Sequence, residues 1–269
     1  QFQTENTLYN PAFSGEVRVP LKSVPALPLD PKKVIARRAA MELRSGAILN
    51  LGVGIPVNVS AVAAEEGVSN DFVLTTEAGS VGGVPAGLKD FGHAYNSQAT
   101  VDMDAQFDFY DGGGIDLSVL GLAQTDAMGN VNVSKFNGRV AGAGGFIDIS
   151  QTAKKLVFAG TFTAAGLKEH VEDGKLVIDE EGRFPKFVAN VEQITFSGKY
   201  AAANQQPVVY VTERAVFELT ADGLMLTEIA PGMDLDKDIL AHMDFKPLIS
   251  EDLKQMDAGL FAEEWGGLS

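Results

Sequence analysis

The chain of 269 residues contains no cysteine and only three histidines. Without cysteine it cannot form disulfides, thiolate metal sites or a thiol nucleophile. The histidines stand far apart, at positions 93, 170 and 242, so no pair has the spacing of a zinc motif such as HExxH. We therefore expect no metal site. Because proteins of reducing compartments rarely carry disulfides, we also expect a cytoplasmic location.

Positive charge is scarce as well. There are 21 lysines and arginines against 36 aspartates and glutamates, which gives a net charge of -15. Nucleic acid requires a basic protein face to neutralise its phosphates, so we do not expect it as a partner. A small anionic ligand can still bind where backbone amides and a few basic side chains create a local positive field.

Long apolar runs are also missing. No segment reaches the roughly 18 to 20 apolar residues of a membrane span. The first residues lack the basic and apolar blocks of a signal peptide. The hydrophobic content of 45% is nevertheless enough for a sizeable core. We expect a soluble α/β protein that does not enter a membrane.

The chain divides into an arm and a domain. Residues 1–30 are polar, interrupted by prolines and without an amphipathic period, which is typical of an extended linker or surface arm. We expect residues 31–269 to form one folded domain, and a further domain to lie upstream of the arm.

Regular structure is predicted from Asp30 and Pro31, an N-cap residue followed by proline at the first helical position, and this helix should end at Gly46. Apolar runs at 47–51 and 72–76 predict buried strands. Between them an alanine-rich helix should begin at the proline of NLGVGIP and end at a glycine.

Further strands are predicted along the rest of the chain, with hairpin turns late in the sequence. The alternation of strands and helices predicts an open, mainly parallel sheet with helices on both faces, to which the hairpins add antiparallel strands. The predicted later elements are strands at 117–122, 131–133, 155–159, 208–211 and 215–219, turns at 172–175 and 222–223, and a last helix at 234–243.

Glu77 is the candidate functional side chain. It follows the strand run 72–76 directly and precedes a glycine-rich stretch, so we expect it at the carboxyl end of a buried strand with little bulk around it. Ligands of open α/β sheets bind at this edge. An ionised glutamate can act there as a general base, a metal ligand or a nucleophile, and the alternative is a solvated glutamate at a strand end.

Three other glycine-rich segments are candidates for close approach to a ligand. The turn LGVGIP stands between a predicted strand and helix, GGG occupies residues 112–114, and AGAGG occupies residues 141–145. Glycines between ordered elements expose backbone N–H groups, although tight turns or solvent loops explain the first two equally well.

These segments together resemble the C-terminal half of the family I CoA-transferases, of the propionate or short-chain acyl-CoA:acetoacetate type. The likeness runs from about residue 9 to the C-terminal helix. The matching sequences are YNPAFSGEVRVPL, VIARRAAMELRSG, NLGVGIP, TTEAGSVGGVPAG, QFDFYDGGGIDLS, GNVNVSKFNGRVAGAGGFIDI, QITFSG and TERAVFELT.

The resemblance implies the CoA-transferase fold and a role for each matched position. Glu77 matches the nucleophile that forms a glutamyl-CoA thioester, and Gly145 matches the residue whose backbone amide stabilises the oxyanion. The residues that would lie against CoA are Gly54, Ile55, Pro56 and Gly144.

The implied activity is transfer of CoA between a short-chain acyl-CoA and a free carboxylic acid such as acetate, propionate, butyrate or acetoacetate. CoA is then a substrate and covalent intermediate, with no tightly bound cofactor, no ATP and no metal. The resemblance also implies that the chain works only with an N-terminal (alpha) half, as part of an oligomer.

Two other functions remain open at this stage. The sequence AGSVG differs by one residue from the G-x-S-x-G motif of serine hydrolases, with Ser80 as the nucleophile and His242 as its base. The implied fold also serves sugar-phosphate isomerases and non-catalytic effector-binding modules, and a fold does not determine a function.

Overall fold

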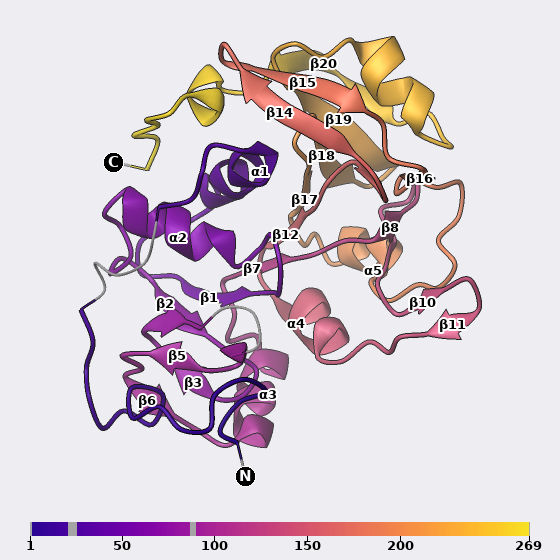
Figure 1. The fold of residues 1–269 in the computed structure, drawn as a ribbon. Helices are drawn as coiled ribbons and strands as arrows, with labels where there is room; N and C mark the ends of the chain where they lie inside the picture. The colour runs from indigo at the N-terminus through magenta and orange to yellow at the C-terminus, as the bar shows by residue number, and fades with distance from the viewer. Residues whose placement is uncertain (1, 21–25, 87–89, 269) are drawn as a thin grey trace.

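The computed structural model describes residues 2–20, 26–86 and 90–268. In these residues the largest element is a ten-stranded sheet (Figure 1). From one edge to the other its strands are β20 (Leu248–Gln255), β19 (Gly223–Ile229), β18 (Ala215–Thr220), β17 (Val208–Val211), β12 (Leu156–Ala159), β7 (Leu117–Leu120), β1 (Ile48–Leu51), β2 (Val73–Thr75), β3 (Ser80–Val81) and β6 (Ala99–Thr100).

The centre of the sheet is parallel. Strands β17, β12, β7, β1 and β2 run in one direction, with Leu49 of β1 paired to Leu74 on one side and Leu117 on the other. Antiparallel strands extend both ends, through β18 and β19 at one end and β3 and β6 at the other. The prediction of a mainly parallel sheet with antiparallel additions is confirmed. Each predicted central strand is present: β17 has the predicted bounds, and the other four are shorter by one or two residues.

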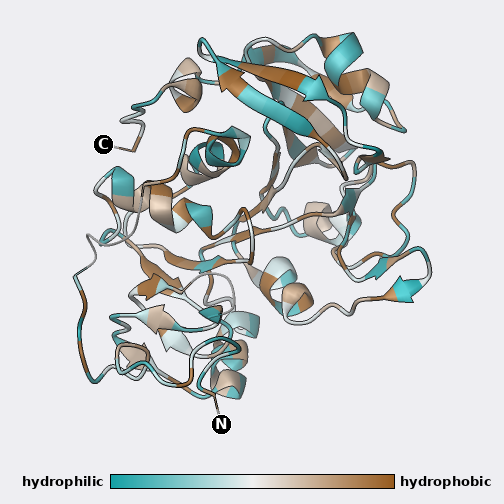
Figure 2. Ribbon diagram, viewed as in Figure 1, coloured by the Kyte–Doolittle hydropathy of each residue, from teal (hydrophilic) through white to brown (hydrophobic). Residues whose placement is uncertain are grey.

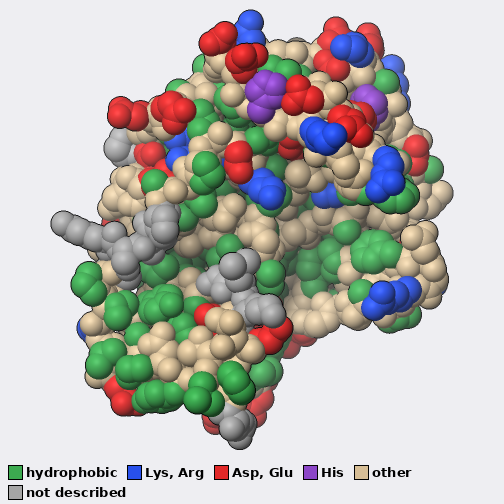
Figure 3. All heavy atoms as spheres, viewed as in Figure 1, with side chains coloured by type: hydrophobic (Ala, Val, Ile, Leu, Met, Phe, Trp, Pro, Cys, Tyr) green, Lys and Arg blue, Asp and Glu red, His purple; other side chains and the backbone are tan. Residues whose placement is uncertain are grey.

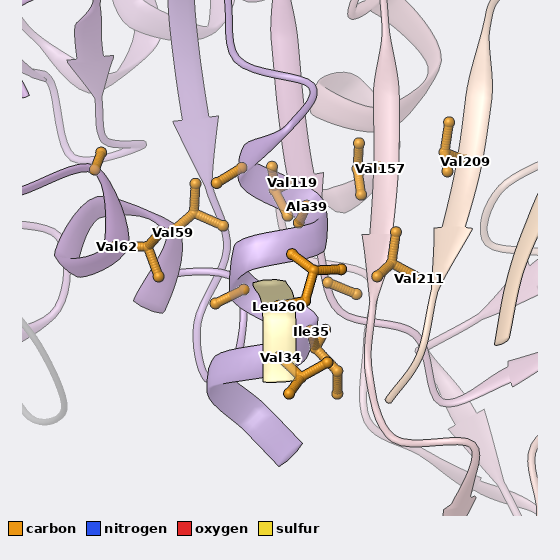
Figure 4. Packing of buried hydrophobic residues seen from close by; sticks show 14 of the residues in the cluster. Val34, Ile35, Ala39, Val59, Val62, Val119, Val157, Val209, Val211 and Leu260 are labelled. Atoms are coloured by element: carbon orange, nitrogen blue, oxygen red, sulfur yellow. The ribbon is translucent and has the colours of Figure 1, made fainter. Parts of the chain in front are cut away.

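Helices cover both faces of the sheet, as predicted. One face carries α1 (Pro31–Ala40), α2 (Asn58–Glu65) and the 3₁₀ turn η5 (Ala258–Phe261). Figure 4 shows Val34 and Ile35 of α1 in one hydrophobic cluster with Val157 of β12 and Val209 and Val211 of β17. A second hydrophobic core lies on the other face of the sheet. The elements that pack there are α3 (Met103–Asp111), α4 (Phe146–Thr152), α5 (Gly198–Ala203) and η3 (Leu235–Ile239).

Helix α1 begins where the sequence predicts and ends earlier. The Asp30 carboxylate accepts a hydrogen bond from the backbone N–H of Lys33 at 2.8 Å, and Pro31 occupies the first turn. The prediction of a helix reaching Gly46 is wrong, because the chain leaves the helix at Ala40 and turns. Gly46 has a positive φ of 80° in that turn, and its amide bonds to the carbonyl of Asp71 at the entrance to the sheet.

Two further helix predictions need correction, and three helices were not predicted. Helix α2 begins at Asn58, since Pro56 lies buried in the preceding turn. The predicted last helix is a π-helical turn, η3, followed by a 3₁₀ turn, η4 (Leu240–His242), and neither is the last element, because β20 and η5 follow. Helices α3, α4 and α5 were not predicted, and the first two adjoin the candidate site described below.

Short two-stranded ribbons connect the main elements. The predicted turn at 172–175 joins β14 and β15 into a hairpin that forms a two-stranded sheet of its own (Figure 1). The ribbon pairs are β4 (Val84–Pro85) with β5 (Ala94–Tyr95), β8 (Gln124–Thr125) with β9 (Val131–Asn132), β10 (Lys135–Phe136) with β11 (Arg139–Val140), β13 (Thr163–Ala164) with β16 (Phe184–Pro185), and β14 (Lys168–Glu172) with β15 (Lys175–Glu180).

Residues 2–20 lie on the domain without forming a helix or strand. The hydroxyl of Thr7 donates to Asp90 at 2.8 Å, and Phe13 is buried with its ring 4.9 Å from that of Tyr95. Exposed apolar side chains remain on this segment, and Figure 3 shows hydrophobic atoms gathered over the same region at the lower left. The contacts anchor the arm beside β5.

Hydropathy follows the layers. In Figure 2 the central strands are largely hydrophobic, while hydrophilic residues gather on the outer turns and on the β10–β11 hairpin. None of the helices in the described ranges has the length and hydropathy needed to cross a membrane.

Candidate active site

Glu77 lies at the turn between β2 and β3, at the carboxyl edge of the parallel strands. The turn is closed by two hydrogen bonds, from the amide of Thr76 to the carbonyl of Ser80 and from the amide of Gly79 to the carbonyl of Thr76, each 3.0 Å. The Thr76 hydroxyl donates to the carbonyl of Gly92 at 2.7 Å and fixes the base of the turn. The strand end and its turn therefore hold the Glu77 backbone in one place, as the sequence predicts.

Glycine is required within this turn at position 79. Its φ is 102°, and a Cβ added there would lie 2.0 Å from the carbonyl oxygen of Val101. A side chain at this position would push the Glu77 turn away from the segment before α3. The glycine-rich sequence thus serves close backbone packing next to the carboxylate.

Gly145 lies against the Glu77 carboxylate. A Cβ added to Gly145 would lie 3.1 Å from Oε2 of Glu77 and 2.6 Å from Cζ of Phe107. Gly145 immediately precedes α4, and in the described residues its amide donates to no protein acceptor. A free N–H group is therefore available within the immediate surroundings of the carboxylate.

Burial and a neighbouring negative charge act on Glu77. Removal from water raises the pKa of its carboxyl group above the ordinary value of 4.5, and the carboxylate of Asp148 on α4 raises that pKa further. No salt bridge joins Glu77 to a cation in the described part of the chain. The group is consequently more basic than a solvated glutamate, which strengthens it as a nucleophile when ionised.

A buried hydroxyl network supports the strand that carries Glu77. The Tyr110 hydroxyl donates to Thr75 Oγ1 at 2.9 Å, and Thr75 donates to the carbonyl of Leu49 at 2.8 Å. Asn50 donates its amide to the Tyr110 hydroxyl at 3.3 Å. Helix α3 is thereby tied to the ends of β1 and β2, two residues before Glu77.

The turn after β1 exposes backbone at the same edge of the sheet. Gly54 has a positive φ of 87° and open space where a Cβ would lie, and the amides of Gly54 and Ile55 donate to no protein acceptor among the described residues. Pro56 is buried beneath them. Gly144 also has a positive φ, 55°, and faces open space. All four predicted CoA contacts thus lie in turns at or near the edge where Glu77 lies.

The serine hydrolase alternative lacks its geometry. Ser80 is buried in β3, near one end of the sheet, whereas His242 lies in η4 beyond β19, near the other end, with its Nε2 3.4 Å from Oε2 of Glu181 (Figure 1). The structure therefore does not bring the serine and its proposed base together. A search of the described residues finds no group of three or more histidine, aspartate or glutamate side chains arranged to hold a metal ion.

Sequence reasoning missed three residues of this site: Phe107, Tyr110 and Asp148. Phe107 and Tyr110 stand three positions apart, a helical spacing, inside the stretch QFDFYD that precedes the three glycines. Asp148 follows the AGAGG segment closely in sequence. Its approach to Glu77 depends on tertiary packing, and no local pattern indicates it.

Comparison with known proteins identifies the family. The chain is 54% identical over 272 residues to a caffeate CoA-transferase of Acetobacterium woodii, covering 99% of this chain and 52% of that protein. It is 30% identical to the beta subunit of an acetate CoA-transferase of Haemophilus influenzae, covering 85% of this chain and 96% of the subunit. The chain belongs to the family I CoA-transferases. No family model matches it.

The fold agrees with that membership. The acyl-CoA transferase YdiF of Escherichia coli O157:H7, solved as a thioester complex with CoA, matches 91% of this chain with a TM-score of 0.85 and 51% sequence identity. The match covers 46% of the YdiF chain. This CoA-transferase chain thus spans about half the length of the caffeate CoA-transferase and of YdiF, and nearly the whole of the acetate CoA-transferase beta subunit.

Proposed function

We propose that this chain is the C-terminal half of an enzyme that transfers CoA between a short-chain acyl-CoA and a free carboxylic acid. Glu77 is the nucleophile and Gly145 supplies an oxyanion donor. The observation that carries the proposal is the approach of Gly145, with its unengaged amide, to the Glu77 carboxylate. Acyl transfer requires these two groups together: a nucleophile, and an N–H donor for the negative charge that develops on oxygen.

The reaction then proceeds by exchange of thioesters. The Glu77 carboxylate attacks the acyl-CoA carbonyl, the C–S bond breaks, and an acyl-glutamyl anhydride and CoA thiolate form. The thiolate attacks the glutamyl carbonyl, which releases the first carboxylate and leaves glutamyl-CoA. A second carboxylate reverses these steps and leaves as its CoA thioester. No net oxidation occurs, and the bonds formed and broken are similar in energy.

CoA is proposed to lie along the turns at the carboxyl edge. The unengaged amides of Gly54 and Ile55 and the open space beside Gly144 support this placement. We take residues 31–269 as the domain that carries the nucleophile and residues 1–30 as an arm that leads to the other half. The proposed substrates are acetate, propionate, butyrate or acetoacetate and their CoA esters. An acetate CoA-transferase subunit and a caffeate CoA-transferase are among the relatives.

Steady-state kinetics test the reaction. Since both acids visit the same glutamate in turn, double-reciprocal plots at several acceptor concentrations should be parallel. The complete enzyme should be assayed with acetyl-, propionyl-, butyryl- and acetoacetyl-CoA, and with an aromatic acyl-CoA for comparison. Intersecting lines would indicate a ternary complex and contradict the glutamyl intermediate.

The proposed partner is the N-terminal (alpha) half. Apolar side chains remain exposed around the helices beside Glu77, including Val101 just before α3, Met103 at its start and Ile147 in α4. A partner that covers them would also shield the carboxylate from water. We expect this chain alone to show little transfer, and co-expression with the alpha half to restore activity in a complex of at least two chains. A monomer with full activity, sized by light scattering on the assayed fraction, would contradict this.

A further inference from the structure

The ring of Phe107 lies beside the proposed nucleophile, Glu77. Its ring atoms Cζ and Cε1 lie 2.6 Å and 2.8 Å from the point where a Cβ of Gly145 would be, and Glu77 Oε2 lies 3.1 Å from the same point. The ring edge and the carboxylate oxygen therefore flank a single gap beside the Gly145 backbone that is too small for a methyl group. Within the described part of the chain, no other side chain approaches that point as closely.

The ring is held in this position by its own helix. Phe107 is partly buried against the second core, and its ring meets that of Tyr110 edge to face, with centroids 5.7 Å apart and planes at 77°. Tyr110 is fully buried and fixed through Thr75 to β2, the strand that leads to Glu77. Phe107 is thus linked through Tyr110 to the strand that leads to Glu77.

Phe109 provides a contrast on the same helix. Its ring lies over Gly114, where a Cβ would be 2.4 Å from Cζ, and 42% of the residue is exposed. Among the described residues, the Phe109 ring is not one of the close neighbours of Gly145; it lies beside Gly114 and Tyr110. Phe107 and Phe109 therefore have the same side chain and lie on the same helix, but only Phe107 borders the Glu77 carboxylate.

We propose that Phe107 is a positioning residue that keeps water away from the glutamyl-CoA intermediate and holds the Gly145 backbone against it. This inference rests on the proposed function of Glu77. The reaction that it prevents is hydrolysis: water attacks the glutamyl carbonyl, the C–S bond breaks, CoA leaves as a thiol after taking a proton, and Glu77 returns as a carboxylate. An apolar ring edge offers water no hydrogen-bond partner beside that carbonyl.

The experiment measures the lifetime of the intermediate. The complete enzyme, with both halves, is loaded with acetyl-CoA in the absence of acceptor, freed of excess acetyl-CoA, and followed by intact mass as the CoA adduct decays. We expect the half-life of the adduct to shorten along the series Phe107→Leu, Phe107→Val and Phe107→Ala, at least about tenfold for alanine. Each smaller side chain leaves more room for water beside the glutamyl carbonyl. The ratio of acetyl-CoA hydrolysis to transfer should rise in the same order.

Phe109→Ala is the matched control and should keep the half-life of the unmodified enzyme. Equal half-lives across the folded members of the Phe107 series would overturn the inference. A loss of transfer without faster decay of the adduct would also overturn the inference. Phe107 would then support the structure of the site without protecting the intermediate from water. Failure of the unmodified enzyme to form any adduct would instead contradict the proposed role of Glu77, so the two failures are distinguishable.

Discussion

Gly145 approaches Glu77 so closely that a Cβ on the glycine would lie 3.1 Å from a carboxylate oxygen. The two residues are far apart in sequence and meet because the turn after β2 and the start of α4 share one edge of the sheet. The proposed nucleophile and a backbone amide are therefore adjacent in the folded chain, and such preorganisation reduces the cost of reaching the transition state.

Gly145→Ala should lower kcat strongly. The added methyl group would collide with the Phe107 ring at 2.6 Å and press on the carboxylate, so that the amide and the nucleophile separate. We expect a loss of about two to three powers of ten in kcat, with CoA still bound. Gly121→Ala is the control, because Gly121 has no positive φ and open space at its Cβ position. Unchanged kcat in a folded Gly145→Ala enzyme would remove Gly145 from the site.

Asp148→Asn should shift the pH dependence of Glu77 loading. Burial and the Asp148 charge raise the pKa of Glu77 above 4.5, and the nucleophile must be ionised. The loading rate therefore falls on acidification at a higher pH than for a solvated glutamate. Removing the like charge lowers the pKa, so the acid limb should move to lower pH. Stopped-flow loading at several pH values measures this, with the exposed Asp108→Asn as control. A shift to higher pH in Asp148→Asn would contradict the account.

Tyr110→Phe should destabilise the domain and disturb Glu77. The substitution deletes the hydroxyl that bonds to Thr75 and Asn50 inside the protein, leaving the Asn50 amide without this partner. Leaving a buried polar group unpaired costs about 1 to 3 kcal/mol in free energy of unfolding, measurable by urea denaturation. Tyr200→Phe is the matched control, since Tyr200 is 57% exposed. Equal destabilisation by both substitutions would argue against the network.

Glu169→Gln should stabilise the protein at alkaline pH. Burial and the nearby Glu213 charge raise the pKa of Glu169 to about 9, and its Oε2 is buried without a hydrogen bond. The neutral acid is thus favoured by the fold, and its stabilising contribution is full at low pH and lost as pH rises from about 4.5 toward 9. Glutamine imitates the neutral acid at every pH.

We expect the Tm of Glu169→Gln at pH 8 to exceed that of the unmodified chain by at least about 2 °C, with the difference disappearing near pH 4. Glu172→Gln, in the same hairpin but exposed, should change Tm little. A larger increase in Tm at pH 4 than at pH 8 would contradict the raised pKa of Glu169.

Local patterns predicted the parts of the fold that depend on local chemistry. The cap and proline at Asp30 and Pro31 start α1, and the β-branched run before Glu77 forms β2. Where tertiary contacts decide, the predictions failed: α1 ends at Ala40, because the chain must turn to enter β1, although Leu43 still packs on the core at the expected helical spacing.

The site was only partly predictable for the same reason. The position of Glu77 at a strand end follows from the sequence run, whereas its pairing with Gly145 was implied by the family resemblance and not by any spacing. Helix α3 is short and acidic, and it is stabilised by Phe107 and Tyr110 packing against other elements. Such contacts, and the approach of Asp148, arise from folding over long sequence separations and leave no periodic signal.

Mass spectrometry of the loaded enzyme tests the central claim most directly. The complete enzyme is incubated with acetyl-CoA without an acceptor, reduced with borohydride, digested and analysed by peptide mass. We expect the modification on the peptide that contains Glu77, and none in Glu77→Gln, which keeps the shape of the side chain but cannot attack. An active enzyme whose Glu77 peptide remains unmodified, or a Glu77→Gln enzyme that still transfers CoA, would contradict the account.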